Sequence, residues 1–147
     1  MTDQLKQVIT VQVSIEAPLE KVWQYFTDPT HIVNWNSASE DWHTPRAESD
    51  FKVGGSFLSR MEAKDGSMGF DLRGTFEEIE LHKHIGYSLE DGRKVKIDFT
   101  PISSGTNLVE SFEAESQNSL ELQQYGWQSI LESFKRYVEQ KFENLGI

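Results

Sequence analysis

A chain of 147 residues, 37% hydrophobic and 12% aromatic, predicts one globular domain over residues 1–147 with a single core. The formal net charge of −10 argues against binding to nucleic acid or to anionic membranes, because both rely on cationic side chains. Cysteine is absent, which excludes disulfides, thiolate nucleophiles and Cys-based metal sites. We also expect no signal peptide, no membrane insertion and a cytoplasmic location.

The first third of the chain predicts a strand followed by two short helices. Ile9, Val11, Val13 and Ile15 alternate with polar residues, as in a half-buried strand. Pro18 is suited to the first turn of a helix, and the segment up to Asp28 carries apolar residues at helical spacing: Leu19, Val22, Trp23 and Phe26. Residues 29–35 predict a second short helix with Ile32 and Trp35 facing inward. Residues 36–50 are polar and predict no strand.

Five or six antiparallel strands are expected after this polar stretch. Asp65-Gly66 and Asp91-Gly92 are strong hairpin signals. Alternation places Met68, Phe70, Leu72, Gly74 and Phe76 on one face of one strand. The same pattern places Ile85, Tyr87 and Leu89, then Val95, Ile97 and Phe99, on the core side of the second hairpin. A turn at residues 103–105 leads into a last strand with Leu108, Glu110 and Phe112 on a shared face.

A long amphipathic helix ends the sequence. Asn118 is the predicted N-cap, with Glu121 completing a pattern like a capping box, and the helix is expected to continue to about Leu145. Its apolar stripe comprises Leu122, Gly126, Trp127, Ile130, Phe134, Val138 and Phe142. The elements together predict an α+β fold in which a curved antiparallel sheet wraps around the terminal helix.

The segments "VWQYFTDPTHIVNW", "DFKVGGSFLSRM", "LRGTFEEIE", "LEDGRKVKIDF" and "ELQQYGWQSILESFKRYVE" resemble, in this order, the activator of heat-shock-protein-90 ATPase homologue-like family. The resemblance runs from about Val8 to Glu139. It implies membership of the START-like, or SRPBCC, superfamily and its helix-grip fold, which Bet v-like proteins share. It also implies a cavity between the sheet and the terminal helix, which members use for lipids, hormones, polyketides or other apolar molecules.

Three functions follow as expectations from this resemblance. The first is non-catalytic binding of a lipid- or polyketide-like molecule, with no cofactor. The second is a cyclase or hydrolase that uses Glu110 with Tyr87, His43 or Arg60. The third is an interaction or stress-response module, although the large N-terminal region of the co-chaperone members is absent. The sequence leaves open a homodimer and a chaperone partner.

Gly126 interrupts the terminal helix next to Trp127, at a cost of about 1 kcal/mol relative to alanine. One interpretation is that the missing side chain leaves space for a ligand, with Trp127 as a wall. The alternative is that Gly126 admits a bulky strand side chain such as Phe70 or Phe99.

Glu110 shares its predicted face with apolar residues. A carboxyl buried there must be paired, hydrogen-bonded or raised in pKa, and it could orient a ligand or act as a general base. The alternative is a bulge that turns Glu110 to solvent.

The candidate cavity residues are expected to surround a pocket of a few hundred cubic ångströms, although each aromatic side chain among them could instead be ordinary core. They are Trp35, Trp42, Phe57, Met61, Phe70, Tyr87, Phe99, Glu110, Gly126, Trp127 and Ile130. The sequence shows no recognisable motif for a catalytic nucleophile. His82 and His84 lie two residues apart without a third ligand nearby, and His31 and His43 are isolated, so no metal site is expected.

Overall fold

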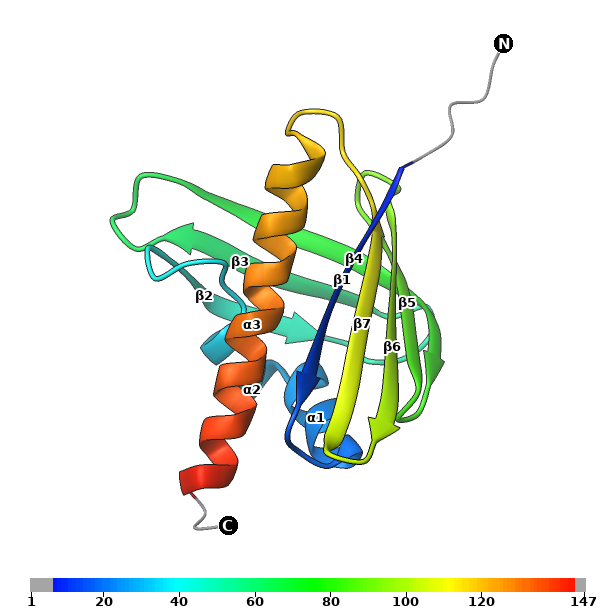
Figure 1. Cartoon of the computed structure of the whole chain (residues 1–147). Helices are drawn as coiled ribbons and strands as arrows, with labels where there is room; N and C mark the ends of the chain where they lie inside the picture. Colours follow the sequence, from blue (N-terminus) through cyan, green and yellow to red (C-terminus); the bar gives the residue numbers. More distant parts are fainter. Residues whose placement is uncertain (1–6, 145–147) are drawn as a thin grey trace.

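The computed structural model describes residues 7–144, and the side chains of residues 7–141. One strand, two short helices, six further strands and a long helix follow one another along this part of the chain (Figure 1). The elements are β1 (Val8–Ile15), α1 (Leu19–Thr27), α2 (Pro29–Trp35), β2 (Trp42–Ser49), β3 (Ser56–Ala63), β4 (Gly69–Glu80), β5 (His84–Leu89), β6 (Lys94–Ile102), β7 (Gly105–Glu113) and α3 (Leu120–Asn144).

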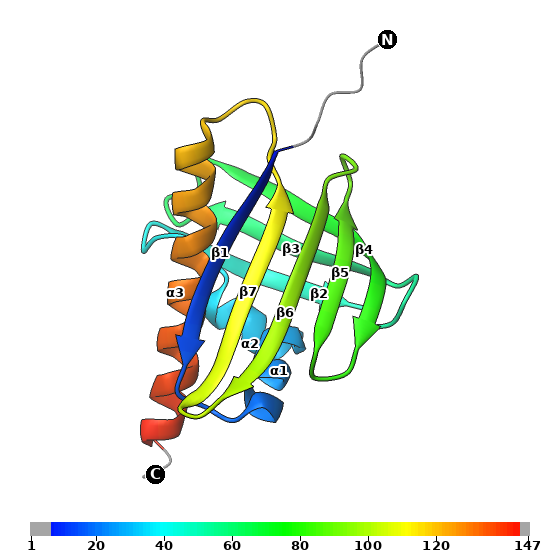
Figure 2. The same cartoon turned by 45° about the vertical axis from the view of Figure 1, so that its right-hand side comes forward.

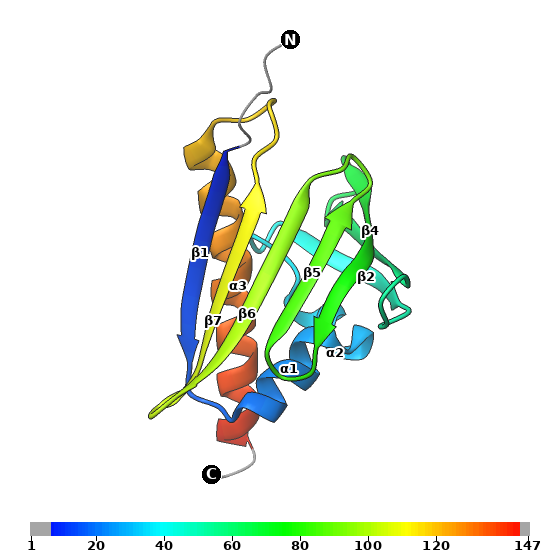
Figure 3. The same ribbon diagram turned by 90° about the vertical axis from the view of Figure 1, so that its right-hand side faces the viewer.

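The strands form one antiparallel sheet in the order β1-β7-β6-β5-β4-β3-β2. The sheet curls, so that the β1–β7–β6 arm and the β2–β3–β4 arm run in different directions around the same concave side (Figures 2 and 3). Helix α3 lies along that side, and α1 and α2 close one end of the space between the arms (Figure 1). This arrangement confirms the predicted α+β helix-grip fold.

The first strand and the two short helices form as predicted. Strand β1 buries every second residue, so its inner face joins the core. Helix α1 follows Pro18, and Asp28 then caps α2 by accepting a hydrogen bond of 2.9 Å from the amide of Thr30. Pro29 occupies the first position of α2, where its missing amide hydrogen costs nothing.

Strand β2 differs from the prediction. It lies within the polar stretch 36–50, for which no strand is predicted. It is an edge strand that pairs with β3 alone. Pro45 falls within the register shift between His43 and Arg46, a place where a strand tolerates the loss of an amide donor. Its burial follows no simple alternation, so the sequence carried no period-2 signal.

Both predicted hairpins are present. Gly66 and Gly92 have positive φ angles of 80° and 91°, and their amides donate to the carbonyl oxygens of Ala63 and Leu89. Only glycine adopts this backbone geometry readily. The turns therefore form at the predicted Asp-Gly pairs.

The start of α3 differs from the prediction by one residue. The Ser119 hydroxyl accepts from the amide of Leu122 at 3.1 Å, whereas the backbone amide of Asn118 donates to Glu115. The cap is therefore Ser119 rather than Asn118, and the expected Asn118–Glu121 capping box does not form. Leu122 is 56% exposed and is not part of the buried stripe. The predicted helix end at Leu145 and the side chain of Phe142 lie outside the described part of the chain.

The core is densest at the C-terminal half of α3. Phe134 and Val138 are fully buried there, and the helix contacts β1, α1 and α2. Across residues 7–144, no helix has the length and apolar character needed to cross a membrane.

Candidate functional site

A cavity of about 140 Å³ lies within the curl of the sheet, beside α2 and the middle of α3. This is smaller than the few hundred cubic ångströms expected from the sequence, and close to the size of a protein cavity known to bind benzene. The residues around it are mostly apolar. They are Phe26, Thr27, Ile32, Trp35, Asn36, Ala47, Glu48, Ser49, Phe51, Phe57, Ser59, Met61, Leu72, Phe76, Ile85, Tyr87, Ile97, Glu110, Trp127, Ile130 and Leu131.

The structure brings seven of the eleven candidate residues to this cavity. They are Trp35, Phe57, Met61, Tyr87, Glu110, Trp127 and Ile130. Three others, Phe99, Phe70 and Trp42, do not line the cavity. Phe99 is core, with its ring 4.9 Å from that of Trp23. Phe70 is 48% exposed near the β3–β4 turn, where its ring is 6.1 Å from that of Trp42.

Gly126, the fourth candidate outside the lining, has open space beside it. A side-chain carbon added at Gly126 would meet no atom within 4 Å apart from the helix's own neighbouring backbone. The alternative that Phe70 or Phe99 approaches the helix here is therefore wrong. No described group comes close to the helix at this point, so the glycine does not serve packing within the chain.

The two helices position the cavity's tryptophans. Trp127 of α3 stacks flat on Phe112 of β7, with ring centroids 3.8 Å apart and an angle of 11° between the planes. Trp35 ends α2, where its indole nitrogen donates to the carbonyl of Tyr25 at 3.0 Å. The Trp35 carbonyl accepts from the hydroxyl of Ser133 on α3 at 2.8 Å. Both indoles are therefore held as walls by neighbours outside the cavity.

Glu110 points inward, as strand alternation predicts. It lies on β7 opposite Val11 of β1 and Ile97 of β6, and the register continues through this position without a shift. The alternative that a bulge turns Glu110 to solvent is therefore wrong. The residue is 6% exposed, and burial raises the pKa of its carboxyl to about 8. Within the described chain its carboxyl makes no hydrogen bond or ion pair.

Tyr87 of β5 lies close enough to Glu110 for the two groups to interact electrostatically. Burial raises the pKa of the Tyr87 hydroxyl well above its usual value, and the negative charge of Glu110 raises it further. The Tyr87 hydroxyl has no hydrogen-bond partner among residues 7–141. The two oxygen-bearing groups thus form a polar corner in a mainly apolar cavity.

A second polar group lies on the other arm of the sheet. The Ser49 hydroxyl of β2 is buried and has no hydrogen-bond partner in the described structure. A buried polar atom without a partner costs free energy on the order of 1–3 kcal/mol. The cavity therefore contains unsatisfied polar groups on both arms, which a bound molecule or water could satisfy.

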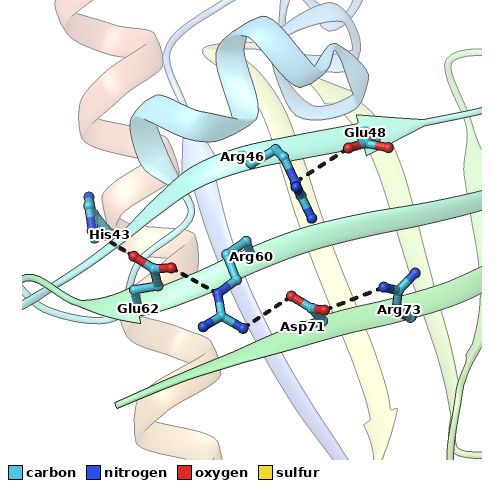
Figure 4. A network of polar contacts seen from close by, with 7 residues as sticks. All are labelled: His43, Arg46, Glu48, Arg60, Glu62, Asp71 and Arg73. Carbon is cyan, nitrogen blue, oxygen red and sulfur yellow. Dashed lines mark hydrogen bonds and ion pairs between the residues drawn. The ribbon is translucent and has the colours of Figure 1, made fainter. Parts of the chain in front are cut away.

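His43 and Arg60, the other acid–base partners considered for Glu110, do not reach the cavity. Phe57, Ser59 and Met61 of β3 line it, so Arg60 and its alternating neighbour Glu62 project from the opposite face. There Arg60 contacts Glu62 at 2.9 Å, and His43 lies 3.7 Å from Glu62 (Figure 4).

The same charged ladder continues across β4. Arg60 contacts Asp71 at 3.3 Å, and Asp71 contacts Arg73 at 3.4 Å (Figure 4). A separate pair, Arg46 and Glu48, lies on β2 at 3.3 Å. The ladder ties three strands together on the face away from the cavity, and its charges are satisfied by one another.

The remaining histidines are dispersed. The His84 ring lies 2.7 Å from Asp98 and 2.9 Å from Glu78. Burial lowers the pKa of His84, but the hydrogen bonds to these two carboxylates outweigh it and raise the pKa overall. His82 packs edge-on against Trp23, and His31 hydrogen-bonds the Tyr137 hydroxyl at 2.7 Å. No three potential metal-ligating side chains cluster in the part of the chain that the structure describes.

Sequence reasoning missed two kinds of lining residue. Ala47 and Ser49 belong to β2, whose pattern gave no strand signal. Ile85 and Ile97 were correctly placed on the inner face, but nothing in the sequence separates inner residues that touch a cavity from those that fill the core. Both kinds of lining residue depend on how the strands pack against one another in three dimensions.

Comparisons with known proteins agree with this architecture. A model of the family described as Activator of Hsp90 ATPase homolog 1-like protein matches residues 16–139. A search of curated proteins found no match.

Several solved structures are similar over nearly the whole chain. The AHSA1-like protein from Aeromonas hydrophila is 44% identical, with a TM-score of 0.86 over 92% of this chain and 94% of that one. Chr148 from Cytophaga hutchinsonii is 48% identical, with a TM-score of 0.76 over 94% of each chain. NE0264 from Nitrosomonas europaea, at 19% identity and a TM-score of 0.79 over 92% of this chain and 96% of that one, shares the fold. The chain therefore belongs to the Activator of Hsp90 ATPase homolog 1-like family.

Proposed function

We propose that the chain binds an apolar or amphipathic small molecule in the cavity between the sheet and α3. The observation that carries this proposal is an unfilled, largely apolar space that contains the unpartnered carboxyl of Glu110. Protein interiors are normally close-packed, and buried polar groups are normally hydrogen-bonded. An unfilled space and an unpartnered buried carboxyl at the same place support a site for a bound small molecule.

The cavity volume limits what enters. About 140 Å³ matches a single ring or a short branched chain. A larger lipid- or polyketide-like ligand would place one group of that size inside and the rest beyond the cavity.

Thermal unfolding with a panel of one-ring and short-chain compounds tests the proposal. We expect a ligand-dependent rise in Tm, because a molecule that binds only the folded state stabilises it. The variant Ala47→Phe adds a ring inside the cavity and should abolish the rise. The matched control Ala38→Phe adds the same ring at an exposed loop position and should keep it. An equal response of both variants, or no rise with any compound, contradicts the proposal.

A second candidate is an acid–base enzyme acting in the same cavity. It is favoured by the Glu110 carboxyl, whose pKa of about 8 suits proton transfer near neutral pH, and by the neighbouring Tyr87. Under this alternative, Glu110→Gln would abolish turnover of a bound compound while leaving its binding intact. Turnover that survives Glu110→Gln would exclude this role.

A further inference from the structure

The charges around the cavity have one sign. The charged residues that line it are Glu48 and Glu110, and none of the described lining residues is Lys, Arg or His. Glu48 is exposed and pairs with Arg46, which leaves Glu110 as the buried ionisable acid. A carboxylate or phosphate group on a ligand would meet no cationic side chain in the lining, and the net charge of −10 adds to the repulsion. Arg93, whose charge reaches Tyr87, is already paired with Asp91 at 2.8 Å.

The polar corner of the cavity offers hydrogen-bond acceptors that have no partner among the described residues. Glu110 and Tyr87 have no hydrogen-bond partner among the described residues, although the charge of Glu110 raises the pKa of the Tyr87 hydroxyl. An ionised carboxylate only accepts hydrogen bonds, and a tyrosine oxygen can accept as well. The complementary ligand group is therefore one rich in donors.

The walls favour positive charge. Seven of the lining side chains are aromatic: Phe26, Trp35, Phe51, Phe57, Phe76, Tyr87 and Trp127. The face of an aromatic ring is electronegative and attracts a cation within about 6 Å, most strongly where water is excluded. A neutral ligand gains nothing from this property beyond ordinary apolar contact.

We propose that this cavity selects small organic cations, namely a protonated primary amine on an apolar body about the size of one ring, with Glu110 as its counter-ion. The inference rests on the proposed function and specifies its ligand class. The ammonium group donates to the Glu110 carboxylate and to the Tyr87 oxygen, while the apolar body contacts the aromatic walls.

The ionisation of Glu110 gives this interaction a distinctive pH dependence. The groups that face Glu110 are apolar on β1, β6 and α3, and titratable only at Tyr87. Burial and the charge of Glu110 keep the pKa of the Tyr87 hydroxyl well above its usual value, and the nearby Arg93 only partly opposes this rise. Because the carboxyl has a pKa of about 8, it is mostly protonated at pH 7, and its ionisation there costs about a factor of ten in affinity. Amine binding should therefore tighten as pH rises from 6 to 8.5 and release a proton. Binding of a neutral ligand that uses the protonated acid should weaken over the same range.

Isothermal titration calorimetry with benzylamine, benzyl alcohol and benzoate tests the inference, because these probes share one ring and differ in charge. At pH 8.5 we expect the amine to bind about tenfold more tightly than the alcohol, and benzoate to bind most weakly. At pH 6 the preference for the amine should shrink. Glu110→Gln should remove this preference at every pH and should make the affinity for the alcohol independent of pH. A cooperative thermal unfolding transition of the variant shows that it is folded.

Two outcomes overturn the inference in different ways. If the alcohol binds as tightly as the amine at pH 8.5, or if Glu110→Gln keeps the amine preference, the selectivity is wrong and the proposed binding function stands. If none of the three probes binds, the inference and the proposed binding of one-ring molecules both fail.

Discussion

The two halves of α3 face different surroundings. In the C-terminal half, Phe134 and Val138 are fully buried. In the N-terminal half, Leu122 is 56% and Tyr125 is 70% exposed.

The difference arises from what surrounds the helix. Its C-terminal half lies beside α1 and α2, whereas its N-terminal half extends beyond these two helices (Figures 1 and 2). The same helix therefore anchors the core at one end and borders a cavity at the other. A fold built in this way can keep a hollow without losing its stability.

Truncating the anchored half of α3 should have a large effect on stability. Phe134 packs against Trp35 and Phe26, with ring centroids 4.7 and 5.2 Å away. Phe134→Ala should lower the free energy of unfolding by about 3–5 kcal/mol, because it opens a void in a close-packed core. Ile130→Ala, one turn away on the cavity, should cost less because its side chain already borders empty space. Urea unfolding measures both, and equal losses would contradict the contrast between the two halves.

Glu110 should make stability fall with pH. The pKa of its carboxyl is about 8 in the folded state, above the usual value of 4.5. The folded state therefore holds a proton that the unfolded state has lost at every pH between these values. Stability contributed by this group is complete below pH 4.5, and it decreases by about 4–5 kcal/mol by pH 8.

Glu110→Gln removes this dependence, so the difference in stability between variant and wild type should grow as pH rises from 5 to 8. Urea unfolding at several pH values measures it. The comparison cancels the opposite trends of carboxylates whose pKa is lowered by hydrogen bonds, such as Asp28. A difference that stays constant with pH would show that Glu110 is not buried as described.

Gly126→Ala should stabilise the protein by up to about 1 kcal/mol. Alanine is the better helix former, and the added carbon meets no atom within 4 Å. The same change at Gly74 is the matched control, since its added carbon would lie 2.5 Å from the Phe57 ring and 2.8 Å from the backbone oxygen of Ser88. Thermal unfolding should therefore show a higher Tm for Gly126→Ala and a lower Tm for Gly74→Ala. Destabilisation by Gly126→Ala would mean that a group does approach the helix there.

His84 should give the smallest effect. Its folded pKa is raised, so its contribution to stability is complete below its unfolded pKa and is lost as pH rises through the folded value. His84→Gln should cost less than about 1 kcal/mol at pH 6 and less still at pH 9, because its carboxylate partners Glu78 and Asp98 are largely solvated. Thermal unfolding at the two pH values measures the loss of stability. A larger loss at pH 9 than at pH 6 would contradict the raised pKa of His84.

The fold could be predicted in most of its parts because periodicity and turn chemistry agree along the chain. The alternation in β1, the Asp-Gly turns and the stripe of α3 each favour one structure. Strand β2 escaped prediction because an edge strand with Pro45 and exposed polar residues lacks a two-residue period. The cap of α3 moved to Ser119 because both Asn118 and Ser119 are good N-cap residues.

The candidate site could be predicted only in part. Alternation correctly turned Glu110 inward, because a strand period applies to polar and apolar residues alike. The same rule placed Phe70 on the inner face but could not show that this end of β4 extends beyond the helix. Whether an inner residue meets a void depends on how two curved arms diverge, which is a property of the whole sheet.

Diffraction from crystals pressurised with xenon tests the central claim most directly, because xenon occupies dry apolar cavities. We predict a xenon atom among Trp35, Phe57 and Trp127, and none between Phe134 and α1. A crystal without xenon at this position, in which Trp127 and Phe57 have moved together to fill the space, would contradict the account.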